Sequence, residues 1–234
     1  MIDYSGLRGR LADVRARIAR AAGRAGRDPA SVRLVAVSKT FAAGDVRAAA
    51  DAGQLEFGEN KVQEALQKMD ATADLSIRWH LVGHLQSNKA KKAGRFDVVH
   101  SLDSVALAHK LDEAAMAAGR QMELLVQVDL AGEATKHGLR EDELMPVFDA
   151  ARAGRATRIV GLMLLPPAVE DPEAARPYFR TLRGVRDRLL ARGVDASMLR
   201  ELSMGMSHDF EVAIEEGATL VRVGTAIFGS RSYV

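Results

Sequence analysis

Lys39 comes directly after residues 33–38 (RLVAVS), a short apolar run that is rich in β-branched side chains. Such a run is typical of a buried strand, so we expect the lysine stem to be enclosed and its ammonium group to face the strand end. An enclosed lysine is a nucleophile toward aldehydes, with which it forms Schiff bases. The alternative is a strand-end lysine that simply extends its ammonium group into water.

Two segments near the C-terminus could bind an anion, because they offer small residues and free backbone N–H groups. Residues 203–207 (SMGMS) connect an expected strand to a helix, and Gly224 and Thr225 follow the last expected strand. In β/α barrels the loops after strands seven and eight often bind phosphate, and N–H groups there attract negative charge. Each segment alone is also compatible with an ordinary turn. Together with Lys39, they suit an aldehyde that carries a phosphate.

Arg222 lies two residues before Gly224, so it should point into a barrel from the same face of its strand. An inward arginine needs an acceptor, since burying a charged group without a partner is costly. A ring nitrogen can be that acceptor. The alternative is a carboxylate, such as that of Asp129 or Glu59.

The elements that must position these residues alternate between strand and helix along the whole chain. We expect strands at residues 33–38, 55–58, 77–82, 98–100, 123–129, 159–164, 200–203 and 220–223. Helical patterns lie at residues 43–52, 60–69, 88–93, 104–118, 141–152, 173–192 and 209–216, after a first amphipathic helix that carries Leu7, Leu11, Val14 and Ile18. This alternation predicts an α/β fold, a single (β/α)8 TIM-type barrel with an extra N-terminal helix, which forms one domain over residues 1–234. A doubly wound open sheet is the alternative.

Composition excludes several classes of protein. The net charge of the 234 residues is only +2, so the pI near 9.0 does not by itself indicate a nucleic-acid partner. The basic cluster Lys89, Lys91, Lys92 and Arg95 is typical of a solvated helix face, with phosphate or nucleic-acid contact as the alternative. There is no cysteine, and the histidines lack metal-ligand spacing, so we expect no zinc site. No apolar run is long enough for a signal peptide or a membrane span, which predicts a soluble cytoplasmic protein.

Six motifs carry a resemblance to a known family. They are AVSKT at residues 36–40, FGENKVQE at 57–64, WHLVGHLQSNK at 79–89, GLM at 161–163, LSMGMS at 202–207 and VRVGTAIFG at 221–229. In this order they resemble the pyridoxal phosphate homeostasis protein family, which is related to the N-terminal barrel of alanine racemase. The resemblance runs from about residue 5 to the C-terminus.

The resemblance implies that the chain binds pyridoxal 5′-phosphate (PLP) as a Schiff base on Lys39. It places Ser203, Gly224 and Thr225 around the phosphate and Arg222 at the pyridine nitrogen. Further positions that match residues near the cofactor are Asn60, His80 and Met206. Since Trp79 and His80 are adjacent on one strand, only one can point inward, and we expect it to be His80. Residues 164–167 (LLPP) and His208 depart from the family pattern, and we expect them at the rim.

The implied function is intracellular PLP homeostasis, in which PLP is stored or delivered to PLP-dependent apo-enzymes, with a monomeric carrier and no substantial turnover. The alternative is an amino-acid racemase, which needs a second acid/base on the opposite face of the ring. The tyrosine that a further domain supplies in alanine racemase has no evident counterpart here. Arg222 would also leave the pyridine nitrogen unprotonated and weaken the ring as an electron sink. A lysine-dependent aldolase is a third reading, and Lys136 is a candidate for a second aldehyde site.

Overall fold

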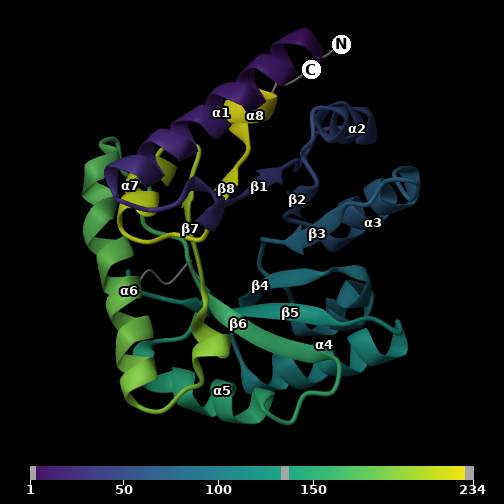
Figure 1. The fold of residues 1–234 in the computed structure, drawn as a ribbon. Helices are drawn as coiled ribbons and strands as arrows, with labels where there is room; N and C mark the ends of the chain where they lie inside the picture. The colour runs from purple at the N-terminus through teal and green to yellow at the C-terminus, as the bar shows by residue number, and fades with distance from the viewer. Residues whose placement is uncertain (1–3, 133–136, 230–234) are drawn as a thin grey trace.

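Eight parallel strands close into a barrel in chain order in this computed structural model, which describes residues 4–132 and 137–229 (Figure 1). The strands are β1 (Arg33–Val37), β2 (Glu56–Glu59), β3 (Arg78–Leu81), β4 (Val98–Leu102), β5 (Met122–Val128), β6 (Thr157–Leu164), β7 (Glu201–Met206) and β8 (Leu220–Val223). The last strand pairs with the first, from Arg33 opposite Leu220 to Ala36 opposite Val223. The closed ring confirms the predicted barrel and rules out the open sheet.

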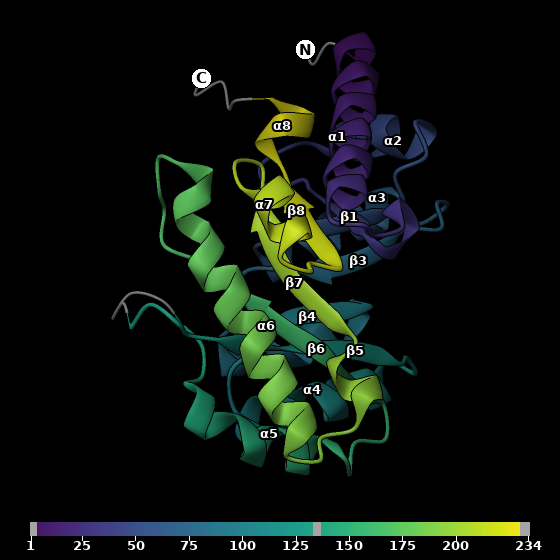
Figure 2. The same ribbon diagram turned by 60° about the vertical axis from the view of Figure 1, so that its left-hand side comes forward.

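Helices surround the barrel on the outside (Figures 1 and 2). They are α1 (Tyr4–Arg24), α2 (Ala43–Asp51), α3 (Val62–Ala71), α4 (Val105–Ala117), α5 (Leu144–Ala151), α6 (Arg176–Ala191), α7 (Phe210–Glu215) and α8 (Thr225–Phe228). The connection from β3 to β4 is a 3-10 helix, η2 (Ser87–Arg95), where the sequence predicted an α-helix over residues 88–93. The short α8 was not predicted, because four residues show no helical periodicity.

The side chains of the strands alternate between the barrel interior and the helix layer, as the period of two requires. Trp79 packs outward in the large core between strands and helices, and it lies beside Phe57. His80 is fully buried and points into the barrel, where it contacts His100 from the next strand. The predicted orientation of the Trp79–His80 pair is therefore confirmed.

The N-terminal helix α1 packs against α7 and α8 on the outside of the barrel (Figure 2). Its apolar stripe is buried, namely Leu7, Leu11, Val14 and Ile18. Arg10 Nε donates to the carbonyl oxygen of Ile227 at 2.7 Å, and Arg17 forms an ion pair with Glu211 at 2.9 Å. The extra helix thus holds the segment that follows β8, where the phosphate group was expected.

The expected end of strand seven at Ser203 is wrong, because β7 continues to Met206. The pairing of β7 with β8 shifts register between Ser203 and Met206, and Gly205 has φ +92°. Glycine in the left-handed region at a bulge lets the strand continue, although the same residue suggested a turn in the sequence. Ser203 consequently lies inside the barrel wall, and Ser207 follows the strand instead.

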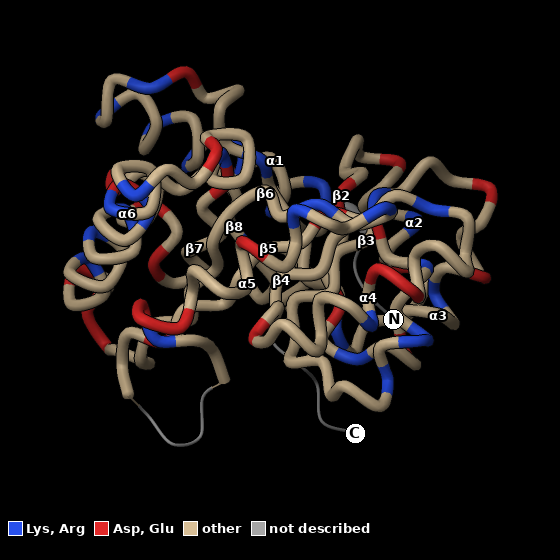
Figure 3. Tube along the Cα trace, turned by 90° about the horizontal axis from the view of Figure 1, so that it is seen from below, with Lys and Arg blue, Asp and Glu red and all other residues tan. Residues whose placement is uncertain are grey.

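Among the described helices, none has the length and apolar character that a membrane span requires. Lys and Arg are intermixed with Asp and Glu along most of the described chain (Figure 3), although α6 itself carries five arginines and one aspartate. In the basic cluster, Arg95 forms an ion pair with Asp70 at 2.8 Å, whereas Lys89, Lys91 and Lys92 are exposed. This mixture favours the solvated-face interpretation of the cluster.

Candidate functional site

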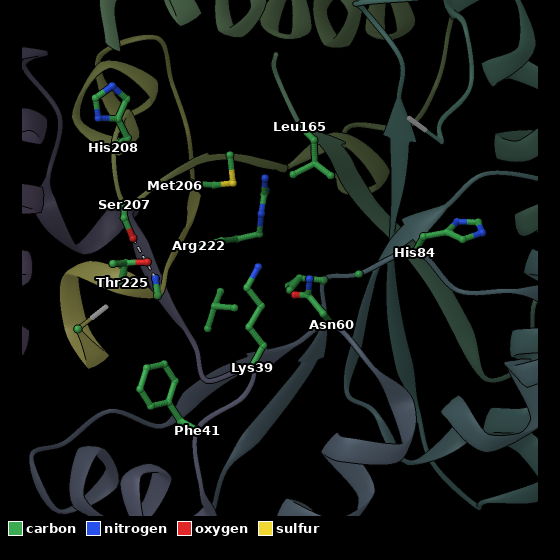
Figure 4. Close-up of a pocket in the computed structure, with 15 residues that line it drawn as sticks. Lys39, Phe41, Asn60, His84, Leu165, Met206, Ser207, His208, Arg222 and Thr225 are labelled. Atoms are coloured by element: carbon green, nitrogen blue, oxygen red, sulfur yellow. Dashed lines mark hydrogen bonds between the residues drawn. The ribbon is translucent and has the colours of Figure 1, made fainter. Parts of the chain in front are cut away.

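A cavity of about 510 Å³ opens at the carboxyl ends of the strands (Figure 4). Its lining includes six of the eight residues that the resemblance singled out, namely Lys39, Asn60, Met206, Arg222, Gly224 and Thr225. Lys39 and Arg222 both extend into this space (Figure 4). Leu165 and His208 also line it, so both departures from the family pattern do lie at the rim. Ser203 and His80 are fully buried and do not line the cavity.

Lys39 is held by the residues on either side of it. The Ser38 hydroxyl donates to Glu59 Oε1 at 2.6 Å, and the Ser38 N–H donates to the Gly58 carbonyl at 3.0 Å. Thr40 adopts φ +71°, which is unfavourable for a β-branched residue. Its N–H donates to Glu64 Oε1 at 2.5 Å, which compensates for that conformation. The backbone around Lys39 is therefore fixed before any ligand binds.

A second lysine, Lys68 on α3, lies behind Lys39 and is buried. Its ammonium group donates to Glu59 at 2.6 Å, Glu64 at 2.8 Å and the Ser38 carbonyl at 2.7 Å. Burial raises the pKa of Glu59 more than the bonds from Lys68 and Ser38 lower it. For Glu64, burial acts in the same upward direction, but the bonds from Lys68 and Thr40 prevail and lower its pKa. Lys68 is thus a structural cation, and its helical position offered no sign of this role.

Asn60 follows β2 and is positioned by a close approach of the next loop. A Cβ atom on Gly83 would lie only 2.3 Å from the Asn60 carbonyl oxygen, so no larger residue fits there. The Gly83 carbonyl accepts a bond from the buried Ser101 hydroxyl at 2.8 Å. These contacts hold the loops after β2, β3 and β4 together beside the cavity.

Ser207 connects the two loops in which phosphate binding was expected. Its hydroxyl accepts from the Gly224 N–H at 3.1 Å and from the Ala226 N–H at 3.4 Å. Figure 4 shows Ser207 and Thr225 side by side at one edge of the cavity. Asp209 fixes the loop further, because its carboxylate accepts from the Met206 N–H at 2.6 Å. The serine that joins these two loops is therefore Ser207, four residues beyond Ser203 and just after the end of β7.

Arg222 points into the barrel, as predicted, and forms part of the floor of the cavity. Its Nη1 donates to Ser203 Oγ at 2.5 Å, and its Nη2 donates to the Leu164 carbonyl at 2.8 Å. No carboxylate of the described residues lies within ion-pair distance of it, so the expected alternative of a salt bridge to Asp129 or Glu59 is wrong. Burial lowers the pKa of Arg222 to about 10, which still leaves the guanidinium charged at neutral pH.

A line of buried polar groups runs from Arg222 through the barrel interior. Ser203 Oγ lies 2.8 Å from His100 Nδ1, and His100 Nε2 lies 2.9 Å from His80 Nδ1. His80 Nε2 in turn lies 3.0 Å from Glu56 Oε2, at an angle less favourable than that of a hydrogen bond. The four groups span the interior between the cavity floor and the opposite end of the barrel.

The direction of these bonds follows from the chemistry of the two ends. Arg222 can only donate, so the single proton of Ser203 is free to be donated to His100 Nδ1. His100 then carries its proton on Nε2 and donates to His80, whose own Nε2 proton faces the Glu56 carboxylate. Burial lowers the pKa of His80 and lowers that of His100 well below its usual range, so both rings are neutral. Each neutral ring has one donor and one acceptor, which is what this direction requires.

This line explains why Ser203 and His80 do not line the cavity. Ser203 contacts Arg222 directly, and His80 is linked to it through His100. The sequence placed His100 at the end of the expected strand 98–100 but assigned it no role, whereas β4 continues to Leu102 and His100 faces the barrel interior. The prediction for Lys136 falls outside the described residues.

The family described as "Alanine racemase, N-terminal domain" matches residues 10–232 of the chain. A pyridoxal phosphate homeostasis protein of Aquifex aeolicus is 44% identical over 225 residues, which are 96% of this chain and 98% of the relative. The structure of PipY from Synechococcus elongatus with PLP bound is 40% identical and has a TM-score of 0.84. The match covers 95% of this chain and 100% of that one.

More distant structures show only that the barrel is shared. Alanine racemase from Corynebacterium glutamicum is 18% identical with a TM-score of 0.72, and the match covers 99% of this chain but 63% of that one. The close matches run over nearly the full length of both sequences. The chain therefore belongs to the pyridoxal phosphate homeostasis protein family, within the family of the alanine racemase N-terminal domain.

Proposed function

We propose that the chain binds PLP in the cavity at the carboxyl ends of its strands and acts in PLP homeostasis. Lys39 would hold the cofactor covalently through its ε-amino group, and Ser207, Gly224 and Thr225 would bind the phosphate. Arg222 would donate to the pyridine nitrogen. The observation that carries this proposal is the direction of Lys39 and Arg222 into one cavity whose edge is formed by Ser207 and Thr225 (Figure 4).

The residues present fit this cofactor. A cavity of about 510 Å³ is within the usual range for small-molecule sites. A Cβ atom on Gly224 would lie 3.1 Å from the Val37 carbonyl oxygen, so glycine keeps the phosphate loop close to β1. PLP supplies an aldehyde that condenses with primary amines and a ring that withdraws electrons. Asn60 and Met206, which also line the cavity, would contact the ring.

We propose a carrier rather than a racemase or a transaminase. A charged Arg222 would donate to the ring nitrogen of bound PLP and keep it unprotonated, which would weaken the ring as an electron sink. Among the described residues, no tyrosine lines the cavity, and the inward-facing His80 is fully buried and does not line it. The homologous proteins are named for homeostasis, which supports the same conclusion. Delivery to PLP-dependent apo-enzymes, a monomeric state, a cytoplasmic location and a single domain over residues 1–234 stay predictions.

The proposal is tested by titrating the purified chain with PLP and with pyridoxal, and by following the visible absorbance. We expect Thr225→Val to weaken PLP more than pyridoxal, because the hydroxyl would donate to the phosphate and a charge-assisted bond contributes about 1.5–3 kcal/mol. Lys39→Ala should abolish the absorbance change with both ligands. Loaded protein should also restore the activity of a PLP-dependent apo-enzyme. Equal weakening of both ligands by Thr225→Val would contradict the proposed phosphate site.

A further inference from the structure

A second cluster of chemically competent side chains lies beside the cavity. His84 follows β3, Asp103 directly follows β4, and His137 precedes residues that return to pair with β5. Each offers one ligand atom, and these atoms lie within 4.8 Å of one another. His84 Nδ1 is 3.5 Å from Asp103 Oδ2, and the two imidazole rings stack with centroids 3.4 Å apart and planes 11° apart. Three successive loops therefore bring two imidazoles and one carboxylate together.

We propose that His84, Asp103 and His137 bind a first-row divalent transition metal ion such as Zn²⁺. Two histidines and one carboxylate form a ligand set that favours such ions over Mg²⁺ or Ca²⁺. In a tetrahedral site with bonds of about 2.0–2.2 Å the ligand atoms lie about 3.3–3.6 Å apart. Side-chain rotations must therefore bring the three groups closer and separate the stacked imidazoles, because the lone pairs of parallel rings do not converge on one ion. All three side chains are at least partly exposed, and they are free to make these rotations.

The loops that carry the ligands are held by buried polar side chains. The hydroxyl of Ser101, which is fully buried, binds the Gly83 carbonyl directly before His84. The amide of the buried Gln127 donates to the His137 carbonyl at 2.5 Å. The Leu139 N–H donates to the Gln127 carbonyl at 2.8 Å, and the Asp129 N–H donates to the Leu139 carbonyl at 2.9 Å; these bonds fix the segment on the other side of His137. Such backbone support is what a metal site with a defined geometry needs.

The metal site is distinct from the PLP site, and it does not depend on the proposed function. His84 is one of the residues that line the cavity, so the two sites adjoin, but its imidazole ring points away from Lys39 and Arg222 (Figure 4). A bound ion would join the loops after β3, β4 and β5 at the rim, with water in the remaining coordination positions. The sequence spacing does not predict the cluster, because His84 and Asp103 are 19 residues apart and Asp103 and His137 are 34 residues apart.

The test is a titration of the chelator-treated full chain with Zn²⁺ by calorimetry and with Co²⁺ by visible absorbance. We expect one tight site, a rise in melting temperature with Zn²⁺, and a Co²⁺ spectrum with d–d bands. Since even outer-shell changes typically cost 10–100-fold in metal affinity, loss of a ligand in His84→Ala, Asp103→Asn or His137→Ala should cost at least about 100-fold.

The matched control is His208→Ala, since His208 is another exposed histidine at the same rim. This substitution should leave Zn²⁺ affinity unchanged. The absence of stoichiometric binding to the unmodified chain would overturn the proposal. So would binding that survives all three ligand substitutions, because the ion would then be held elsewhere.

Discussion

Replacing Ser203 with alanine tests whether this residue supports Arg222 or binds the ligand directly. The hydroxyl accepts from Arg222 at 2.5 Å and contacts His100 at 2.8 Å, and the residue is fully buried. Its loss removes a bond to a charged group, which contributes about 1.5–3 kcal/mol, and leaves His100 Nδ1 without a donor, at about 1–3 kcal/mol. The two effects overlap, so we expect the free energy of unfolding to fall by about 3 kcal/mol.

The assay is thermal unfolding followed by circular dichroism, without added PLP. For a chain of this size, about 3 kcal/mol corresponds to a fall of about 6–12 °C in melting temperature. The control is Ser207→Ala, because Ser207 is only partly buried and makes longer contacts of 3.1 and 3.4 Å. It should change the melting temperature little but weaken PLP more than pyridoxal. A Ser203→Ala protein that melts like the unmodified chain and selectively loses PLP would refute this reasoning and restore Ser203 to the phosphate site.

Three further outcomes follow from the buried groups and the cavity. Because burial lowers the pKa of His80 and His100, the unfolded chain binds more protons than the native chain below about pH 6.5. The free energy of unfolding should therefore fall as the pH drops, by up to about 1.4 kcal/mol per pH unit for each histidine. Melting temperatures that stay constant between about pH 7.5 and 5.5 would count against neutral rings. Lys68→Met should destabilise the fold by about 3–5 kcal/mol, since it leaves buried Glu59 without its cation, and urea unfolding measures this loss. Deuterium exchange at Cα of alanine should stay far below ordinary enzyme turnover; a rate near 1 s⁻¹ would indicate a second base, with His208 at the rim examined first.

The barrel could be predicted from the sequence because its signals are local and repeated. Each strand is a short apolar run that ends at small or polar residues, and each helix has its own period. Alternation allowed only one of Trp79 and His80 to point inward, and it placed Arg222 on the same strand face as Gly224; the choice of His80 over Trp79 went beyond alternation. The position of Lys39 at a strand end needed only the boundary of β1, which was predicted to within one residue.

The errors came from features that depend on distant contacts. Gly205 looks like a turn residue in isolation, but pairing with β8 keeps the chain in a strand through a bulge, and this moved Ser203 from the cavity into the barrel wall. The partner of Glu59 is Lys68, whose burial depends on how α3 packs beside β2 and Ser38, the residue after β1. His84, Asp103 and His137 come from three loops, so no spacing rule could bring them together.

The most direct test of the central claim is to locate the covalent attachment of PLP. The loaded chain is reduced with borohydride, digested, and examined by mass spectrometry for peptides that carry the reduced cofactor. We expect the label on Lys39, and we expect Lys39→Ala to remain folded and unlabelled at the same PLP concentration. A label that maps mainly to another lysine, such as Lys136 or Lys68, would contradict the account.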